Sequence, residues 1–384
     1  MSLQTKVDSR FQEEFKRKPF VFIAPGRINM IGEHTDYNEG FVMPTAIDKH
    51  FAFAIAPNES ELFTIHALDL DEKVSFSKKD LNTGHSWQNF LMGVVDGLKR
   101  RGKIVGGVNC VFSSNIPGGA GLSSSAALCS GFGFALNRLF DLSLDRLELA
   151  KIAQESEHLF IGAKVGIMDM YASLFSKKNS VMLLDCRNFT HEYLPIIFDG
   201  YEILLIDTKV KHTLASSEYN NRREACEEGV RIIQRHFENV TALRDVNLSM
   251  LEKVRKEVDG IVFKRCLYIV QENDRIQKAS AYLNLNDLSA FGKLMYETHW
   301  GLSQQYEVSC VESDWLVRLA AVHGVTGSRQ MGGGFGGCTI NLIHKAQRLD
   351  FEEQVRKKYF GEFKKEPDFY SVNLADGVHE FVNR

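Results

Sequence analysis

GGAGLSSS, residues 118–125, joins a glycine-rich turn to three consecutive hydroxyl side chains. Glycines let backbone N–H groups converge on an anion, and the free N–H groups and dipole of a helix N-terminus favour negative charge there. A helix is predicted directly downstream, because apolar side chains recur at spacings of three and four: Leu128, Phe132, Ala135, Leu136 and Leu139. An ordinary serine-capped helix after a flexible turn is the alternative. The run of small residues before Leu122 favours a phosphate-binding loop.

This loop differs from that of an ordinary P-loop NTPase. No GxxxxGK[ST] sequence occurs in the chain, so backbone N–H groups, a metal ion and a cationic side chain from elsewhere must meet the phosphate charge. A serine hydroxyl from residues 123–125 can ligate Mg²⁺, which usually takes one or two protein groups, so a carboxylate is expected nearby. Glu157 is the candidate, because it lies on the less polar face of a predicted helix, where an unpaired carboxylate would be costly. An ion pair at a helix end is the alternative.

Upstream, the stretch APGRINMIGEHTDYNEGFVMP, residues 24–44, concentrates hydrogen-bonding side chains between glycines and turn formers. Its charged and imidazole groups are Arg27, Glu33, His34 and Asp36. Such a set suits a polyhydroxylated ligand, since a sugar hydroxyl can donate to a carboxylate and accept from a neighbouring N–H. A solvated turn with incidental charges is the alternative.

Downstream, the chain carries a lone acidic residue and a second glycine-rich segment. Asp169 lies among apolar residues in GIMDM, residues 166–170, and we predict a catalytic carboxylate beside a cation such as Arg27, with a turn or helix-cap Asp as the alternative. GGGFGG, residues 332–337, formally contains the dinucleotide fingerprint GxGxxG, but a strand is predicted after it where that fingerprint requires a helix. A glycine turn that closes a site is the prediction.

Strand-like and helix-like segments alternate without a regular βαβ repeat. Helices are predicted at residues 87–98, 145–160 and through most of 217–318, and strands at residues 20–24, 51–56, 63–67, 74–76, 107–112, 181–185, 202–207, 339–344 and 370–374. The early strands are expected to form an antiparallel sheet. We predict a mixed α+β chain with two lobes, residues 1–200 and 201–384, a boundary near 180–215, and a C-terminal tail that can return to the first lobe.

The composition limits the classes of partner. A 384-residue chain with 44% hydrophobic residues and a net charge of −3 is an ordinary globular protein without the basic field that nucleic acid or an anionic membrane would need. Its seven cysteines include no CxxC pair, and no apolar segment resembles a signal peptide or a membrane span, so a cytoplasmic protein is expected.

Three of these segments, in this order, resemble motifs of the GHMP small-molecule kinases over nearly the whole chain: GRINMIGEHTDYNEGFVMP at 26–44, PGGAGLSSSAA at 117–127 and GGGFGGCTINL at 332–342. The first is similar to the sugar signature of the galactose-specific branch of that family. Shorter matches to that branch are SEH at 156–158, GIMD at 166–169 and HTLASSEY at 212–219. The resemblance implies two lobes, the first like the second domain of ribosomal protein S5 and the second α+β, with the active site between them.

The resemblance also implies an activity and a set of roles. ATP, with Mg²⁺, would phosphorylate the C1 hydroxyl of α-D-galactose, with Asp169 as the catalytic carboxylate and Arg27 as its cationic partner. The sugar would contact Glu33, His34, Asp36, Gly166 and Tyr219. The phosphates of ATP would lie on Gly118, Gly119, Ala120, Gly121, Leu122, Ser123 and Ser124, the adenine near Trp87, and Mg²⁺ on Ser125 and Glu157. A monomer without an obligate protein partner is expected.

Two residues depart from the family pattern. Met170 stands where a glutamine is common, and Gly333 stands where the third motif often has alanine. Neither departure removes a group with an implied chemical role, so we expect changes in rate or nucleotide affinity before changes in reaction type.

Other functions are weighed against particular residues. A kinase for N-acetylgalactosamine or arabinose shares the phosphate motif, but the stretch 35–38, TDYN, follows the galactose pattern. A non-catalytic galactose and ATP sensor is a hypothesis of a different class, and the intact Ser125-Ala126-Ala127 opposes it. Mevalonate and homoserine kinases lack a segment like GEHTDY.

Overall fold

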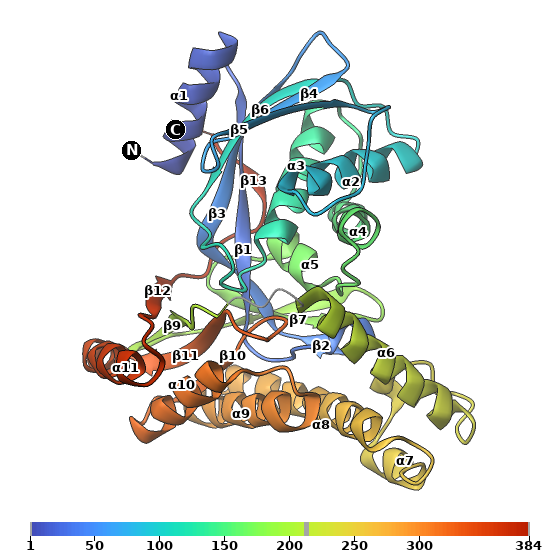
Figure 1. The fold of residues 1–384 in the computed structure, drawn as a ribbon, viewed down its shortest axis with the longest axis vertical. Helices are drawn as coiled ribbons and strands as arrows, with labels where there is room; N and C mark the ends of the chain where they lie inside the picture. Colours follow the sequence, from blue (N-terminus) through green and yellow to red (C-terminus); the bar gives the residue numbers. More distant parts are fainter. Residues whose placement is uncertain (1, 211–214, 383–384) are drawn as a thin grey trace.

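The computed structural model describes residues 2–210 and 215–382, arranged as an upright N-terminal lobe on an elongated C-terminal lobe (Figure 1). The helices are α1 (Leu3–Phe15), α2 (Trp87–Arg100), α3 (Ser124–Leu139), α4 (Arg146–Ser156), α5 (Met168–Phe175), α6 (Ala215–Gln234), α7 (Leu248–Lys253), α8 (Gly260–Asn284), α9 (Leu288–Gly301), α10 (Val311–Val322) and α11 (Arg348–Phe363). The mixed α+β prediction is confirmed.

The strands form three sheets. The N-terminal lobe holds a sheet in the order β13-β1-β3-β6-β4-β5, with bounds β1 (Phe20–Asn29), β3 (Pro44–Pro57), β4 (Leu62–Ala67), β5 (Glu72–Ser77), β6 (Val108–Ser114) and β13 (His379–Glu380). The C-terminal lobe holds the order β10-β11-β9-β12, with bounds β9 (Tyr201–Asp207), β10 (Gly327–Gln330), β11 (Cys338–His344) and β12 (Asp368–Val372). The third sheet is β2 (Phe41–Val42), β7 (Ser180–Asp185) and β8 (Thr190–Pro195).

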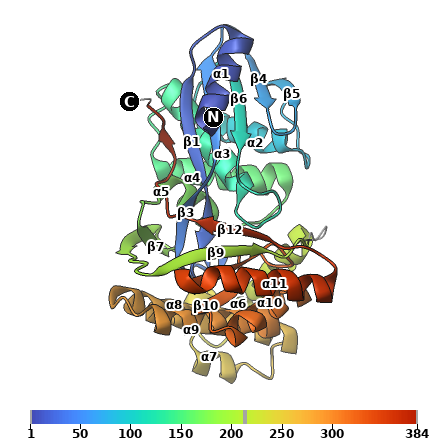
Figure 2. The ribbon, with the colours of Figure 1, turned by 90° about the vertical axis from the view of Figure 1, so that its left-hand side faces the viewer.

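The N-terminal sheet is buried on both faces because its central strands alternate two sets of apolar side chains. Val21 faces α1, where it packs with Phe11, whereas Phe22 lies on the face of α3 and meets the ring of Phe134 edge-on. Figure 2 shows α1 and the bundle of α2, α3 and α4 on the two sides of this sheet. The sheet is a rigid base for the phosphate-loop helix α3.

One feature of the predicted sheet is wrong. The strands 51–56, 63–67 and 74–76 are present within β3, β4 and β5, but β4 pairs with β6 in parallel, with Ile65 opposite Cys110, so the sheet is mixed and not purely antiparallel. The long connection from β5 through α2 to β6 makes this parallel pairing possible, because it crosses over the sheet.

The C-terminal sheet also divides its apolar side chains between two faces. Leu204 and Ile206 of β9 pack with Phe351 and Tyr359 of α11, whereas Ile203 and Leu205 join the main core. Helices α8 and α9 pack side by side along the base of the molecule (Figure 1). In the described part of the chain, no helix combines the length and apolar character that crossing a bilayer requires.

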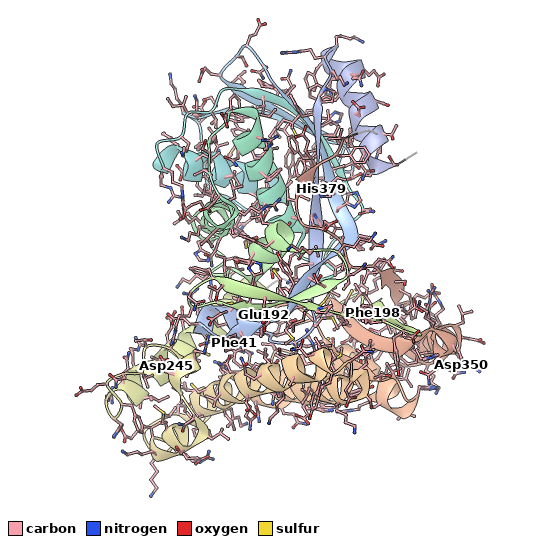
Figure 3. All side chains as sticks on the ribbon, turned by 180° about the vertical axis from the view of Figure 1, so that it is seen from behind. Phe41, Glu192, Phe198, Asp245, Asp350 and His379 are labelled. Carbon is pink, nitrogen blue, oxygen red and sulfur yellow. The ribbon has the colours of Figure 1, made fainter. Side chains whose placement is uncertain are left out.

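The junction of the lobes is formed by segments from distant parts of the sequence. Phe41, Glu192 and Phe198 lie along it in Figure 3, while Asp245 and Asp350 mark opposite ends of the C-terminal lobe. The end of the chain returns to the N-terminal lobe, where Glu380 of β13 lies opposite Phe22 of β1. The division at residue 200 stays a prediction.

Candidate active site

Arg27 and Asp169 form the centre of the site. Arg27 follows a bulge in β1, and its Nε and Nη2 donate to the two carboxylate oxygens of Asp169 at 2.7 and 2.9 Å. Its Nη1 donates to the Gly121 carbonyl at 2.7 Å, so one guanidinium joins the phosphate loop to the first turn of α5. Burial opposes the charge of Arg27, but the charges of Asp169 and Glu33 raise its pKa, so it stays cationic.

Arg27 and Asp169 line the first of two cavities, and they are hydrogen-bonded to Gly121 and Ser123, which line the second. One, of about 290 Å³, is lined by Arg27, Glu33, His34, Asp36, Ala163, Val165, Gly166, Met168, Asp169, Tyr219 and Gly332 to Gly334. The other, of about 450 Å³, is lined by the phosphate loop and by the glycine turn, including Ser123, Ser124, Ser125 and Gly333 to Gly337. Gly333 and Gly334 line both cavities. We call them the sugar cavity and the phosphate cavity.

In the sugar cavity, Asp36 and Gly166 are packed against each other. A Cβ on Gly166 would lie 1.7 Å from Oδ2 of Asp36, so only glycine fits there. Burial and the nearby charge of Asp169 raise the pKa of Asp36 to about 7, although hydrogen bonds from the backbone of Tyr37 and Met168 lower it in part. Asp36 therefore changes its charge near neutral pH.

Aromatic side chains surround His34, whose backbone has a φ of 64°. Its Nδ1 is 2.8 Å from the Tyr37 hydroxyl, which is 2.7 Å from the hydroxyl of Tyr306. The His34 ring also lies 5.2 Å from that of Tyr219 on α6. Burial and the charge of Arg222 lower the pKa of His34 to about 3, so it is neutral at physiological pH. Of the matching segment 212–219, residues 212–214 lie outside the described residues.

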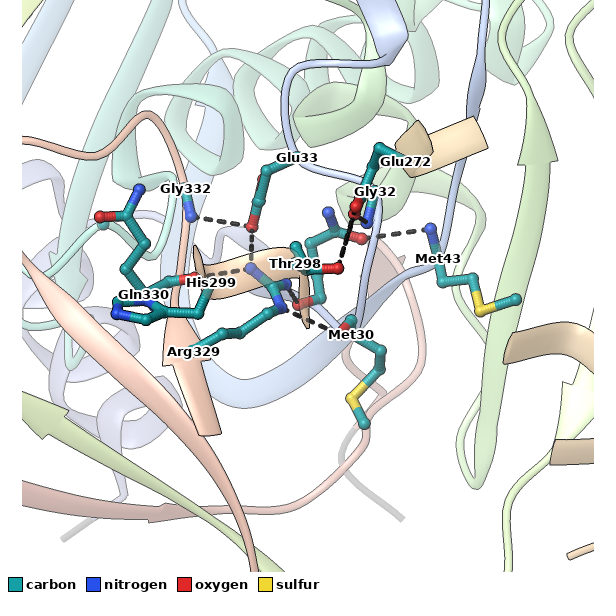
Figure 4. Close-up of polar contacts among 12 residues, drawn as sticks. Met30, Gly32, Glu33, Met43, Glu272, Thr298, His299, Arg329, Gln330 and Gly332 are labelled. Carbon is teal, nitrogen blue, oxygen red and sulfur yellow. Dashed lines mark hydrogen bonds and ion pairs between the residues drawn. The ribbon is translucent and has the colours of Figure 1, made fainter. Parts of the chain in front are cut away.

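Glu33 is held by the C-terminal lobe. Its Oε1 accepts from Nη1 of Arg329 at 3.0 Å and from the Gly332 backbone N–H at 2.9 Å (Figure 4). Both side chains are buried. The five residues predicted to bind the sugar are thus brought together in one cavity: Glu33, His34, Asp36, Gly166 and Tyr219. They come from three places in the chain, namely the segment after β1, the turn before α5, and α6.

The phosphate loop opens α3 as predicted, and glycine is needed there for the backbone. Gly119 and Gly121 both have φ of 76°, and Ser123, the N-cap of α3, has a φ of 56°. Its hydroxyl makes a short hydrogen bond to Oδ2 of Asp169, so Ser123 reaches the carboxylate as well as lining the phosphate cavity. Leu122 lines the phosphate cavity, whereas Gly118 and Ala120 line neither cavity. None of the three has a polar side chain, so each can offer a ligand only backbone groups.

Ser125 and Glu157 fit the expected metal chemistry. Ser125 lines the phosphate cavity, and its hydroxyl bonds to the carboxyl of Glu157, which begins a π-helical turn after α4. Burial raises the pKa of Glu157 to about 7, with the charge of Asp169 adding to the effect. Both are oxygen donors of the kind Mg²⁺ prefers. Among the described residues no group of three or more His, Cys, Asp or Glu could hold a metal. Mg²⁺ usually takes only one or two protein groups and completes its shell with phosphate and water.

Trp87 is not brought to either cavity. It begins α2, its Nε1 donates to Glu72 at 2.6 Å, and its ring meets Phe112 edge-on at 5.3 Å. Its contact with adenine stays a prediction.

Two residues that contact the sugar-cavity region could not be predicted from the sequence. Arg329 precedes the third motif by three residues, and Tyr306 lies in a π-helical turn after α9. Neither belongs to a motif discussed above, and each meets the site only through tertiary packing. The glycine turn 332–334, in contrast, could be predicted from its run of glycines. Its predicted role at a site is supported because Gly333 and Gly334 line both cavities.

Family models match this chain in three places. Residues 9–57 match a galactokinase galactose-binding signature, residues 89–177 the N-terminal domain of GHMP kinases, and residues 279–361 the C-terminal domain of GHMP kinases. These ranges contain the segment 26–44 and the phosphate loop, and the third includes the glycine turn.

Relatives and solved structures agree with this pattern. The chain is 40% identical over 357 residues to a galactokinase of Thermosipho africanus, covering 92% of this chain and 98% of that one. It is 38% identical to a galactokinase of Clostridium acetobutylicum, covering 98% and 99%. The structure of Lactococcus lactis galactokinase complexed with galactose superposes with a TM-score of 0.95 at 29% identity, covering 99% and 100%. Methanococcus jannaschii mevalonate kinase, at 17% identity, 94% and 99% coverage and a TM-score of 0.63, shares the fold alone.

Proposed function

The chain belongs to the galactokinase family of GHMP kinases, and from that premise we propose that it transfers the γ-phosphoryl group of ATP to the C1 hydroxyl of α-D-galactose. The products are galactose 1-phosphate and ADP. The observation that carries the proposal is the Arg27–Asp169 pair, which lines the sugar cavity and is hydrogen-bonded to Gly121 and Ser123 of the phosphate cavity.

Positioning is the main contribution of the site. In phosphoryl transfer the transition state is loose, so holding donor and acceptor in line and neutralising charge matter more than a strong base. The carboxylates of Glu33 and Asp36 accept hydrogen bonds from the sugar, and the C1 hydroxyl is directed at Asp169. Backbone N–H groups of the phosphate loop and of α3 orient the phosphates.

Asp169 receives the proton late. As the C1 oxygen bonds to the γ-phosphorus, the bond from that phosphorus to the bridging oxygen of ADP breaks, and the proton of the C1 hydroxyl passes to the carboxylate of Asp169. Arg27 holds both oxygens of that carboxylate, which fixes its direction, and its charge stabilises the negative charge that develops on the transferring group.

Ser125 and Glu157 are the residues that would hold Mg²⁺. When bound, the ion supplies charge neutralisation for the phosphates. The raised pKa of Glu157 is consistent with this role, because a buried carboxyl favours its neutral form until a cation binds beside it.

The experiment is ADP release by purified protein with Mg-ATP, in parallel with galactose, glucose, N-acetylgalactosamine, arabinose, mevalonate and no acceptor. Turnover with galactose well above every other acceptor is the expected result. Turnover with N-acetylgalactosamine or arabinose instead would replace the substrate. Galactose binding without turnover of any acceptor would favour a sensor and withdraw the catalytic roles of Asp169 and Arg27.

A further inference from the structure

We infer that Arg329 is a positioning residue for galactose, which acts by fixing the carboxylate of Glu33 in the sugar cavity. The inference rests on the proposed function in one respect, that galactose occupies this cavity. Arg329 itself does not line the cavity, so it acts through Glu33.

Arg329 is a buried cation from the C-terminal lobe that is bonded to the end of β1 in the N-terminal lobe. It lies on β10 and is fully buried. Its Nε donates to the Met30 carbonyl at 3.1 Å, its Nη2 to the Asn29 carbonyl, and its Nη1 to its neighbour Gln330 at 2.6 Å. Figure 4 shows these contacts converging below Glu33. A guanidinium with this many fixed acceptors has one orientation, which lysine cannot reproduce.

The two oxygens of Glu33 have different surroundings. Oε1 accepts from Arg329 and from the Gly332 N–H, as described above. For Oε2 no hydrogen bond is found among residues 2–210 and 215–382, and Glu33 lines the sugar cavity. Oε1 therefore already accepts two hydrogen bonds from the protein, whereas Oε2 is available to accept one from a ligand in the cavity. Without Arg329, Glu33 would lose the ion pair that selects this rotamer.

The backbone around Glu33 is anchored independently. Oε1 of the fully buried Glu272 accepts from the Gly32 N–H at 2.9 Å (Figure 4). Its Oε2 accepts from Arg275 at 2.7 Å. The Tyr268 hydroxyl donates to the Glu33 carbonyl at 3.0 Å. Because these bonds do not involve Arg329, its removal should free the Glu33 side chain while the loop keeps its path.

The test compares Arg329→Met, Arg329→Lys, Glu33→Gln and the double variant Glu33→Gln/Arg329→Met with the wild type. Galactose Kd is measured by calorimetry without nucleotide, and kcat and KM for both substrates by ADP release. The matched control is Arg244→Met. Arg244 also lies in the C-terminal half and donates to a backbone carbonyl of the same segment, Glu39, and to Asp185, but it does not line the cavity.

We expect Arg329→Met to raise galactose Kd and KM by about tenfold or more, with kcat and the KM for ATP changed less than about threefold. Arg329→Lys should restore part of the affinity, because it keeps the charge. In the Glu33→Gln background, Arg329→Met should change galactose Kd by less than about twofold, since the two residues act as one unit. Arg244→Met should lower Tm and leave galactose Kd unchanged.

Equal effects of Arg329→Met in both Glu33 backgrounds, or a parallel rise in both KM values, would overturn the inference and leave Arg329 a purely structural residue. If Arg329→Met does not fold, Arg329→Lys is compared in the Glu33 and Glu33→Gln backgrounds in its place. Failure of the proposed function is seen separately, because it is read from the wild type alone, whereas the inference is read from ratios of galactose Kd.

Discussion

At the scale of single residues, the site depends on carboxylates in different environments. Asp169 is held by two nitrogens of Arg27 and by the Ser123 hydroxyl, whereas Asp36 and Glu157 are buried and, within residues 2–210 and 215–382, form no ion pair. One group is thus fixed in direction, and the other two have pKa values near neutrality. Such a division of roles among neighbouring carboxyls is typical of catalytic sites.

Asp169→Ala should abolish turnover and leave galactose binding largely intact. We expect kcat to fall by roughly 10³-fold or more, because the group that orients and receives the proton is removed. Galactose Kd should change less than about fivefold, since other side chains of the cavity still contact the sugar. ADP release and calorimetry measure the two quantities. Asp96→Asn, which removes a surface partner of Arg100, is the control and should leave both unchanged.

Near-normal turnover of Asp169→Ala would remove Asp169 from the catalytic role. Loss of galactose binding together with turnover would instead make it a binding residue.

Galactose affinity should rise with pH between 6 and 8. The pKa of Asp36 is raised to about 7 by burial and by Asp169, so the carboxyl is mostly neutral at pH 6 and mostly ionised at pH 8. The ionised form accepts the stronger hydrogen bond from a sugar hydroxyl, so Kd should fall by up to about tenfold over this range. His34, with a pKa of about 3, stays neutral throughout and adds nothing. Calorimetry at several pH values measures this, and Asp36→Asn should flatten the profile.

A wild-type affinity that is constant from pH 6 to 8, or a slope that persists in Asp36→Asn, would show that another group controls galactose binding.

At the scale of elements, the site is made by turns that only glycine can form between well-packed strands and helices. In the glycine turn before β11, Gly334 has a φ of 86°, and a Cβ there would lie 2.2 Å from the Val308 carbonyl oxygen. Gly333 has no such restriction, and its nearest neighbour would be the Tyr219 ring at 3.4 Å. Since both residues line both cavities, the turn connects sugar and phosphate binding.

These two glycines give a matched pair of substitutions. Gly334→Ala should raise the KM for galactose and for ATP together, each by about tenfold, because the strained backbone must move away from Val308. Gly333→Ala should change either KM by less than about threefold, because its methyl group meets Tyr219 at ordinary contact distance. Steady-state kinetics with each substrate varied measures both.

A tolerated Gly334→Ala with a damaging Gly333→Ala would reverse this order and show that the cavity, and not the backbone of the turn, limits substitution.

The same elements show what could be predicted from the sequence. The helix after the phosphate loop and the strand after the glycine turn carry local signals, glycine runs and apolar spacing, and both elements are confirmed. Helix α5, which places Asp169 in its first turn, was not predicted, because its eight residues are too short to show a clear period. The parallel pairing of β4 with β6 and the Arg329–Glu33 contact depend on residues far apart in sequence, and no local pattern encodes them.

At the scale of the whole molecule, the lobes are joined by the chain itself in several places. The chain leads from β1 through residues 30–43 and returns through β3. After β12 it enters the N-terminal lobe again as β13. Val378 is fully buried there, and its carbonyl accepts from Nη2 of Arg146 at 3.0 Å. The tail therefore contributes to the core of a lobe formed mostly by the first half of the sequence.

Removing residues 376–384 should lower Tm by roughly 5–10 °C, because a buried valine and the strand pairing of β13 are lost. Galactose Kd should stay within about twofold of the wild type, since the tail does not line the sugar cavity. Differential scanning fluorimetry and calorimetry measure the two. Glu380→Gln, which removes only the 3.5 Å contact with Arg138, is the control and should leave Tm unchanged.

A truncated protein with wild-type Tm would show that the tail adds no stability, and a matching loss of galactose affinity would show that it acts on the site.

The return of β13 also sets an order of events during translation. The edge of β1 that β13 covers is synthesised near the beginning, but its partner leaves the ribosome only after the whole C-terminal lobe. Until then, the nascent N-terminal sheet keeps an open edge, where Phe22 and Ile23 can pair with another chain. The sheet is therefore completed only after the C-terminal lobe has been synthesised, and until then the nascent chain is exposed to misassembly and to chaperone capture.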